Sequence, residues 1–206
     1  MQRISSEDYM AQRPTKEFLA HYITFRPNVL ANDTCDKLVK LYDDNSDLCV
    51  ERSQGEGHFK FSQLDVTEHR QLDNFANLHK QIVSTAVNGL NQYIIDIEGR
   101  DSPNRIPVNN GYEHFRINRT NNNGKDGFGE HTDIGDYASA RRYITALFYL
   151  NDIEVGGDAA FPPLGFSLKP TKGSMLCFPS NWVYLHCGLK PISDPKYIMT
   201  TFAHYL

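Results

Sequence analysis

Two stretches in the first half of the chain carry apolar residues at the spacing of an amphipathic helix. A stripe at intervals of three to four residues predicts a long helix over residues 70–97, because such a stripe lines one helix face. A shorter stripe predicts a second helix over residues 34–45, with Asn32 or Asp33 as its N-cap. The alternating segment 21–30 predicts a strand before it. The two stripes consist of Phe75, Leu78, Ile82, Ala86, Leu90 and Tyr93, and of Leu38, Leu41 and Tyr42.

The second half changes to short segments rich in Tyr, Phe, Ile and Thr, separated by Gly, Pro and Asn. Aromatic and β-branched residues between turn residues are typical of strands. Many short strands without helices between them favour a sandwich or barrel of antiparallel strands. We therefore expect a single domain over residues 1–206, with a helical scaffold over about 1–100 and a β core over about 106–206. The predicted strands cover residues 112–119, 129–134, 142–151, 165–169, 174–179, 184–188 and 195–205.

The composition indicates an ordinary globular protein. Hydrophobic residues make up 40% of the chain and charged residues 22%, and no apolar run is long enough to span a membrane. A net charge of -4 supplies no broad basic field, which argues against a nucleic-acid partner. The four cysteines form no CxxC pair, and the first residues lack an apolar leader. We expect reduced thiols and a cytoplasmic location, which would be the host cytoplasm for a viral protein.

The segment "FGEHTDIGDY" carries a candidate metal site. His131 and Asp133 lie two positions apart at the start of a predicted strand, so alternation would direct both side chains to one face. Two histidines and one carboxylate on one face of an octahedral ion suit non-haem Fe(II) chemistry, because they leave positions open. His186, on a later predicted strand, is the candidate third ligand. A lone HxD pair is also compatible with ordinary structural residues, and the other histidines lack such an acidic neighbour.

Lys196 stands ten residues beyond His186, at the start of the last predicted strand. A dicarboxylate cosubstrate bound to iron at one end needs a cation for its other carboxylate, and a lysine ammonium can supply it. The alternative for Lys196 alone is an exposed lysine after a turn.

Taken together, these segments resemble the Fe(II)/2-oxoglutarate-dependent dioxygenases, in particular their prolyl 4-hydroxylase-like branch. The resemblance covers roughly residues 112–206. It implies a mainly β protein with N-terminal helices, built as a double-stranded β-helix (jelly roll) supported by packed α-helices. It rests on His131-x-Asp133, "RYITALFYLND", "GGDAAFP", "KPTKGSMLCFPSNW", His186 and Lys196.

The resemblance also implies roles for individual residues. His131, Asp133 and His186 would bind Fe(II), and Lys196 would hold the C5 carboxylate of 2-oxoglutarate. Thr145 and Tyr149 match the strand that lines the cosubstrate pocket, where alternation places both on one face. Arg142 matches an arginine near the peptide groove.

The sequence departs from the family pattern at one position of the cosubstrate pocket. The family often has a tyrosine on the strand before HxD, and Arg119 or Thr120 stands there instead. Arg119 is therefore a further candidate for cosubstrate binding. Phe178 and Trp182 are expected in the core. Cys187, next to His186, should face away from the metal.

The function that this resemblance implies is hydroxylation of a protein or peptide, most favourably at proline, as in procollagen-proline 4-dioxygenases. Fe(II), 2-oxoglutarate and O2 would be required, and ascorbate would stimulate. A dioxygenase acting on free proline or another small molecule is an alternative. Another is a non-catalytic jelly roll that binds a metal or other ligand. Nucleic-acid dealkylases are disfavoured because they hold 2-oxoglutarate through arginine, which the last strand lacks.

Overall fold

The computed structural model describes residues 15–54, 59–98 and 110–206. The helical elements are α2 (Lys16–Ala20), α3 (Asn32–Asp44), the 3-10 helix η1 (Ser46–Leu48) and α4 (Asp73–Glu98). The strands of the first half are β1 (Thr24–Arg26), β2 (Val50–Gln54) and β3 (Phe59–Asp65). Those of the second half are β4 (Asn110–Tyr112), β5 (Arg116–Thr120), β6 (Gly127–His131), β7 (Arg142–Tyr149), β8 (Ala159–Phe161), β9 (Phe166–Leu168), β10 (Met175–Pro179), β11 (His186–Gly188) and β12 (Lys196–Tyr205).

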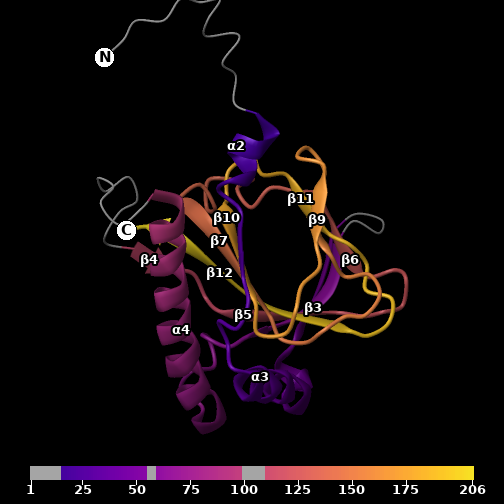
Figure 1. Ribbon diagram of the computed structural model, residues 1–206. Helices are drawn as coiled ribbons and strands as arrows, with labels where there is room; N and C mark the ends of the chain where they lie inside the picture. The colour runs from indigo at the N-terminus through magenta and orange to yellow at the C-terminus, as the bar shows by residue number, and fades with distance from the viewer. Residues whose placement is uncertain (1–14, 55–58, 99–109) are drawn as a thin grey trace, which may run out of the picture.

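The strands form one rolled sheet in the order β1-β10-β7-β12-β5-β3-β6-β11-β8-β9. β2 extends it beside β3, and β4 pairs with β12. The sheet curls so far that β11 and β8 come to face β10 (Figure 1). Phe178 on β10 packs against Phe161 on β8 and His186 on β11, with ring centroids 5.2 and 4.7 Å apart. The expected mainly β, jelly-roll architecture is confirmed.

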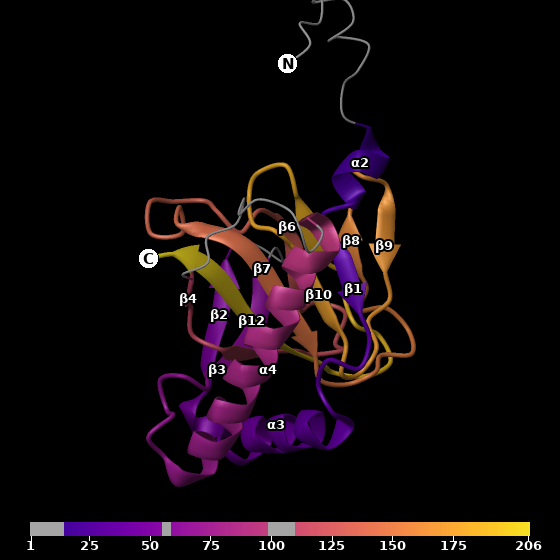
Figure 2. The same ribbon diagram turned by 60° about the vertical axis from the view of Figure 1, so that its left-hand side comes forward.

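The helices cover the outer face of the wall that contains β10, β7 and β12 (Figures 1 and 2). Alternation along each strand supplies this outer face. On β7, Ile144, Ala146 and Phe148 belong to the core shared with the helices. From α4, Phe75 and Ile82 are fully buried in it, as the predicted stripe requires. This layer fixes the wall from behind and leaves its other face to the interior of the roll.

The interior of the roll is only partly filled. A second, smaller core joins β7 and β10 to β8 at one end, with Tyr149, Phe161, Leu176 and Phe178 buried in it. Along the rest of β12, cavity-facing residues alternate with helix-facing ones: Ile198 and Thr200 line a cavity, whereas Met199 lies in the helix core. The fold therefore provides a rigid pocket between its two walls.

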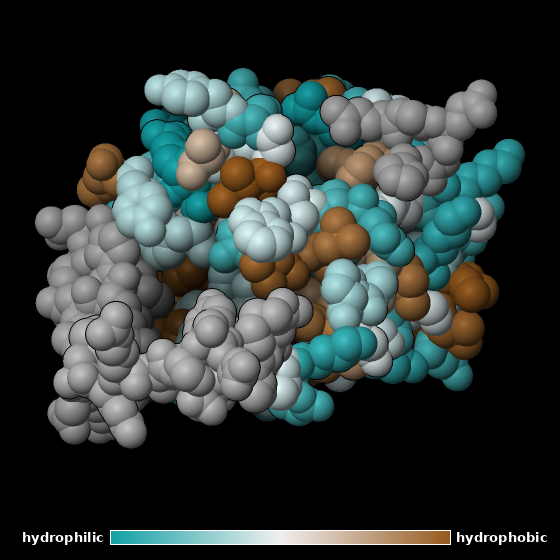
Figure 3. Space-filling view, turned by 90° about the horizontal axis from the view of Figure 1, so that it is seen from above, coloured by the Kyte–Doolittle hydropathy of each residue, from teal (hydrophilic) through white to brown (hydrophobic). Residues whose placement is uncertain are grey.

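The surface mixes polar and apolar groups. Seen from above the view of Figure 1, several apolar groups are separated by polar side chains in the coloured part of the surface (Figure 3). None of the helices in the described parts of the chain has the length and apolar character that a membrane crossing needs. All four cysteines are free thiols, as the absence of paired spacing predicts.

Several predicted elements have other bounds in the structure. The predicted strand 21–30 is confined to β1. The proposed capping of α3 by Asn32 or Asp33 is wrong, because both residues lie within the helix and Ala31 is its N-cap. Asp33 instead pairs with Lys37 at 2.9 Å.

The hairpin strands β2 and β3, and the short β8, were not predicted from the pattern. Residues 55–58, between β2 and β3, lie outside the described residues. The first hundred residues therefore contribute strands to the sheet as well as the helical scaffold.

We expect Gly173→Ala to destabilise the fold strongly. Gly173 has φ +78°, and an added Cβ would meet the carbonyl oxygen of Leu30 at 2.4 Å. Its backbone also joins three segments, because its carbonyl accepts from Val29 and Leu30 and its N–H donates to Tyr149. Left-handed backbone and overpacking together cost roughly 2 to 5 kcal/mol of unfolding free energy. Urea denaturation measures the loss.

Gly124→Ala is the matched control for this substitution. Gly124 has φ +72°, but nothing lies within 4 Å of its added Cβ. It should cost only about 1 to 2 kcal/mol, the contribution of the backbone alone. Equal losses in the two variants would contradict the clash at Gly173.

Candidate active site

The two candidate histidine ligands lie directly opposite each other in the sheet. His131 is the last residue of β6 and His186 the first residue of β11, and the two strands pair antiparallel with these residues in register. Their rings are 4.3 Å apart between centroids. Strand pairing therefore brings together His131 and His186, which are 55 positions apart in the sequence.

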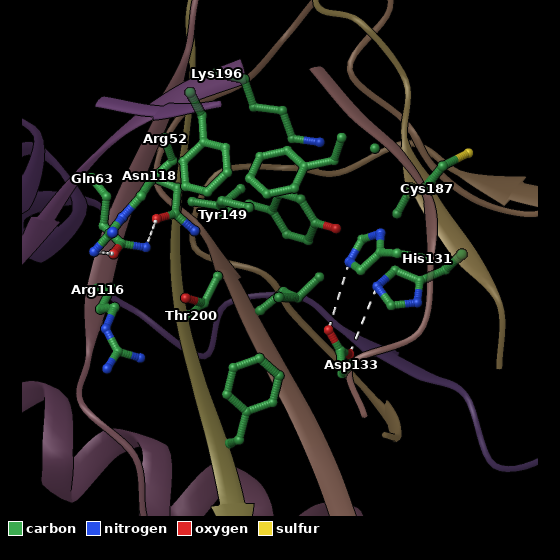
Figure 4. Close-up of a pocket in the computed structure, with 18 of the residues that line it drawn as sticks. Arg52, Gln63, Arg116, Asn118, His131, Asp133, Tyr149, Cys187, Lys196 and Thr200 are labelled. Carbon is green, nitrogen blue, oxygen red and sulfur yellow. Dashed lines mark hydrogen bonds and ion pairs between the residues drawn. The ribbon is translucent and has the colours of Figure 1, made fainter. Parts of the chain in front are cut away.

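Asp133 completes the group from a segment just beyond β6. The strand ends at His131, so the expectation that alternation along one strand aligns His131 with Asp133 is wrong in detail. The Asp133 carboxylate nevertheless faces both rings (Figure 4). Oδ1 lies 3.6 Å from Nε2 of His131, and Oδ2 lies 3.7 Å from Nε2 of His186.

The backbone fixes which nitrogen of each histidine faces the carboxylate. Nδ1 of His131 lies 2.8 Å from the carbonyl oxygen of Gly129, and Nδ1 of His186 lies 3.0 Å from that of Tyr184. A carbonyl only accepts, so each Nδ1 carries the proton and donates it. Each Nε2 is therefore the unprotonated nitrogen, the form in which imidazole binds a metal.

The donor set fits a metal ion. One ligand atom from each of His131, Asp133 and His186 lies within 4.8 Å of the others, so a single ion can contact all three. Two imidazole nitrogens and one carboxylate oxygen form the facial triad that leaves coordination positions open for non-haem Fe(II) chemistry. His186 and Asp133 have only 8% and 9% of their side chains exposed, whereas His131 has 23%. The site is therefore sheltered but open on one side.

A cavity of about 370 Å³ extends from this triad into the roll. Its walls come from both sides of the rolled sheet and include the aromatic side chains of Phe61, Phe128, Tyr149 and Phe202. Lys196 projects into it from the start of β12 (Figure 4). The cavity thus has the metal ligands at one end and a cation on another wall.

Lys196 is a buried cation without an acidic partner. Only 6% of the residue is exposed, and its ammonium donates to the carbonyl oxygen of Gly157. No carboxylate in the described part of the chain lies within ion-pair distance of it. Burial lowers the pKa of Lys196 to about 8, although the charge of Asp158 acts in the opposite direction. A buried ammonium in this state is stabilised by an anion that enters the cavity.

Tyr149 lies between Lys196 and the metal ligands. Its ring centroid is 5.4 Å from Nζ of Lys196, and it lines the cavity together with Leu147. Burial raises the pKa of the Tyr149 hydroxyl, so it stays protonated and can donate a hydrogen bond. The predicted inward face of β7 is therefore present at Leu147 and Tyr149.

Thr145 lies behind the metal site and not on the cavity wall. Its hydroxyl donates to Oδ2 of Asp133 at 2.5 Å and lies 2.9 Å from the hydroxyl of Ser180. Alternation on β7 directs Thr145 to the same inner face as Tyr149, but Asp133 lies between Thr145 and the cavity. Thr145 therefore contacts a candidate metal ligand in the structure, and its role toward the cosubstrate stays a prediction.

Arg142 is held in place by two acceptors. Its Nε and Nη2 donate to both carboxylate oxygens of Glu113, at 2.7 and 2.9 Å, and its Nη1 donates to the Asp133 carbonyl at 2.8 Å. Burial alone would raise the pKa of Glu113, but the hydrogen bonds and charge of Arg142 outweigh it and lower that pKa. Arg142 also packs over the ring of Phe202 on the cavity wall, at 4.0 Å.

Arg119 does not reach the cavity. Alternation on β5 directs Arg116 and Asn118 into the cavity and Arg119 to the opposite face, where its guanidinium lies over the ring of Tyr197 at 5.8 Å. Arg119 is therefore not among the residues that line the cavity, and its role in cosubstrate binding stays a prediction. The β5 residue opposite Ile198 on the cavity wall is Asn118.

Sequence reasoning missed the wall formed by the hairpin β2–β3. Arg52, Phe61 and Gln63 line the cavity from it, and Gln63 donates to Asn118 at 2.8 Å. The signal was present in "FKFSQLD", where odd positions face the cavity and even positions such as Ser62 and Leu64 are buried behind it.

The loop before β11 also differs from expectation. Phe178 is fully buried as predicted, but Trp182 is 81% exposed, so its predicted place in the core is wrong. Trp182 follows the end of β10 and lies in a turn, not on a strand. Cys187 points its sulfur away from the metal ligands (Figure 4), as its position next to His186 predicts.

Comparison with known proteins finds a family model that matches most of the second half of the chain. Residues 115–204 match the 2OG-Fe(II) oxygenase superfamily. This stretch contains the whole triad, Lys196 and Tyr149. No curated protein sequence matches the chain.

Solved structures with a similar fold include prolyl hydroxylases. A viral collagen prolyl hydroxylase from Paramecium Bursaria Chlorella virus-1, solved as its 2OG complex, has a TM-score of 0.66 at 20% identity, over 90% of this chain and 97% of that one. A Trichoplax adhaerens prolyl hydroxylase, in complex with a hypoxia inducible factor peptide fragment, has a TM-score of 0.68 at 14% identity, over 98% and 94%. A Pseudomonas putida prolyl-4-hydroxylase has a TM-score of 0.62 at 16% identity, over 93% and 97%.

The rolled sheet and its His-Asp-His group therefore define an oxygenase of the non-haem iron class. More narrowly, residues 115–204 match the model of the 2OG-Fe(II) oxygenase superfamily, and the chain has a prolyl hydroxylase-like fold. Fe(II) and 2-oxoglutarate are the cofactors of this superfamily, and His131, Asp133 and His186 can hold the iron.

We expect the protein to bind one Mn(II) as a redox-stable substitute for Fe(II). His131→Ala and His186→Ala should each weaken binding by at least about 100-fold, because each removes one of three protein ligands. Titration of free Mn(II) by electron paramagnetic resonance measures this. Circular dichroism should show an unchanged fold.

His21→Ala is the control for these two variants. His21 is exposed and does not line the cavity, so its loss should leave Mn(II) binding unchanged. Wild-type affinity in either ligand variant would remove the triad from consideration as the metal site.

Proposed function

We propose that this 2-oxoglutarate-dependent dioxygenase hydroxylates a prolyl residue in a peptide or protein. The observation that carries the proposal is the placement of a His-Asp-His triad and an unpaired buried ammonium on the walls of one cavity. When bound, Fe(II), 2-oxoglutarate and O2 supply an oxidation in which one oxygen atom enters a C–H bond of the substrate and the other enters succinate, with release of CO2.

The chain's own residues position the reactants for this oxidation. His131, Asp133 and His186 occupy one face of the ion and leave the side toward the cavity free. Lys196 pairs with the carboxylate of 2-oxoglutarate that lies away from the metal. The Tyr149 hydroxyl is a hydrogen-bond donor in the same cavity. The aromatic walls keep bulk water from the reacting atoms.

The shape of the site supports a chain substrate. A second, polar hollow of about 670 Å³ opens on the other side of Arg142 and shares Arg116, Asp133 and Arg142 with the metal-binding cavity. A peptide can continue from one hollow into the other around the metal ligand Asp133, whereas free proline needs only one small pocket. The similar Trichoplax protein was solved with a bound peptide fragment.

Proline is the proposed target because prolyl hydroxylases recur among the similar folds. The aromatic wall that Phe61, Phe128 and Phe202 form beside the metal ligands suits an apolar pyrrolidine ring. Arg142 and Glu113 then lie at the edge of this wall, where a peptide backbone leaves the cavity.

The direct test is turnover with a panel of proline-containing peptides and with free proline. Succinate is measured as product, and mass spectrometry locates any added oxygen atom. We expect oxygen on a prolyl residue of a peptide, with free proline inactive. Oxygen on free proline alone, or on another residue type, would contradict the proposed substrate. Binding of 2-oxoglutarate without even uncoupled succinate formation would favour a non-catalytic module.

We predict that Lys196→Ala weakens 2-oxoglutarate binding about 30-fold or more. Losing a buried charge-assisted contact costs roughly 2 to 5 kcal/mol, and each 1.4 kcal/mol is about tenfold in affinity. Lys196→Arg should recover only part, because the planar guanidinium needs different space. Mn(II) affinity should not change. Titration of the Mn(II) protein with 2-oxoglutarate measures the constants.

Lys169→Ala is the matched control for this prediction. Lys169 also donates to a backbone carbonyl, that of Glu154, but it is exposed and lies outside the cavity. Unchanged 2-oxoglutarate affinity in Lys196→Ala would place the anchor elsewhere.

The affinity for 2-oxoglutarate should fall as pH rises above about 8. The pKa of Lys196 in the free protein is lowered to about 8, so at higher pH the ammonium must regain a proton before it can pair with the carboxylate. Below that pH it is already charged and the affinity should be level. Above it, the loss should approach about tenfold per pH unit. Lys196→Arg should lack this dependence, because arginine stays protonated. A level profile in the wild type would contradict the assignment.

A further inference from the structure

A buried pair of hydroxyl groups contacts the carboxylate of the metal site. Thr145 lies on β7, and Ser180 follows the last residue of the neighbouring strand β10. The side chains are 2.9 Å apart between oxygens, and the two residues are 0% and 1% exposed. They are therefore shielded from water and do not line the cavity.

The direction of these hydrogen bonds follows from the number of protons. An ionised carboxylate only accepts, so Thr145 donates its single hydroxyl hydrogen to Oδ2 of Asp133, at 2.5 Å. The Thr145 oxygen can then only accept from Ser180. Ser180 thus donates to Thr145, and Thr145 donates to Asp133. This order orients the Thr145 hydroxyl toward the carboxylate.

Asp133 needs such a support because no strand holds it. β6 ends at His131, whereas both histidine ligands lie on paired strands. Besides Thr145 and Ser180, the guanidinium of Arg142 holds its backbone carbonyl at 2.8 Å. The side chain and the main chain of Asp133 are therefore fixed from two directions.

The two carboxylate oxygens have different surroundings. Oδ2 accepts the Thr145 hydrogen bond, whereas Oδ1 accepts none from the described residues and lies 3.6 Å from Nε2 of His131. The geometry points to Thr145 and Ser180 as positioning residues that hold Asp133 as a one-oxygen metal ligand through Oδ1. This inference rests on the metal site of the proposed function and does not depend on the substrate.

The test compares metal binding by Thr145→Val, Thr145→Ser and Ser180→Ala without cosubstrate. Loss of a hydrogen-bond partner behind a ligand typically costs about 10- to 100-fold in metal affinity. We expect that loss for Mn(II) in Thr145→Val, near wild-type affinity in Thr145→Ser, and a smaller loss of about threefold to tenfold in Ser180→Ala. Rescue by serine separates the hydroxyl from the packing of the side chain.

The visible spectrum of bound Co(II) supplies a second measurement, independent of activity. In Thr145→Val, Oδ2 is freed to approach the ion, so the bands of Co(II) should shift and change in intensity. In Thr145→Ser they should match the wild type. A spectrum in Thr145→Val identical to that of the wild type would overturn the assignment of Oδ1 as the single oxygen ligand.

Thr24→Val is the matched control. The Thr24 hydroxyl is buried on β1 without a hydrogen-bond partner, so this substitution makes the same change away from the metal. It should bind Mn(II) like the wild type. Should Thr145→Val fail to fold, Ser180→Ala still tests the same chain of hydrogen bonds.

The outcomes separate this inference from the proposed function. Tight Mn(II) binding by the wild type and by Thr145→Val alike would overturn the inference and leave the metal site intact. A wild-type protein that binds no Mn(II) would overturn both.

Discussion

The pairing of β6 with β11 is the contact on which the metal site depends. It places His131 opposite His186, and the backbone carbonyls at Gly129 and Tyr184 turn each ring so that Nε2 faces the carboxylate. Because the ladder fixes both ligands, the site does not rely on a bound ion to bring the histidines together. A shift of the register by one residue would direct one histidine to the opposite face of its strand. The roll of the sheet, which packs His186 against Phe178 on the facing wall, maintains that register.

The same alternation explains why one strand can serve both the core and the cavity. On β12, Met199 and Ala203 pack under the helices, whereas Lys196 and Ile198 face the interior. The helices bury the outer face, which makes the wall rigid enough to hold a charged group at its inner face. The desolvation of Lys196, visible in its lowered pKa, is a cost of folding that an incoming carboxylate offsets. A cavity whose buried ammonium is stabilised by an incoming carboxylate is suited to binding a cosubstrate with that group.

Much of this arrangement could be predicted from the sequence, and the failures have physical causes. The long helix was predictable because its stripe packs against a sheet, and the ligand types were predictable from chemistry. Arg119 was named only because it stands near the position of a family tyrosine, whereas alternation on β5 directs its neighbour Asn118 into the cavity. Trp182 was expected in the core because large aromatic residues on jelly-roll strands usually fill the interior, but it lies in the turn after β10 and is exposed. The hairpin β2–β3 was missed because its alternating polar positions, such as Gln63, face a cavity, so the pattern lacked the apolar face of an ordinary strand.

The way in which Asp133 reaches the metal site could not be predicted from the sequence pattern. The two-residue spacing from His131 was interpreted as alternation along one strand, but the strand ends first and the carboxylate reaches the site from the segment beyond it. Its position depends on Thr145, Ser180 and Arg142, which are distant in sequence and carry no local signal of that role. Thr145 was selected for the right strand face, but its contact with Asp133 was not predicted, because alternation gives the direction of a side chain and not what lies in front of it. For a ligand outside regular structure, tertiary hydrogen bonds fix its position, as strand pairing does for the two histidines. Only the structure reveals these hydrogen bonds.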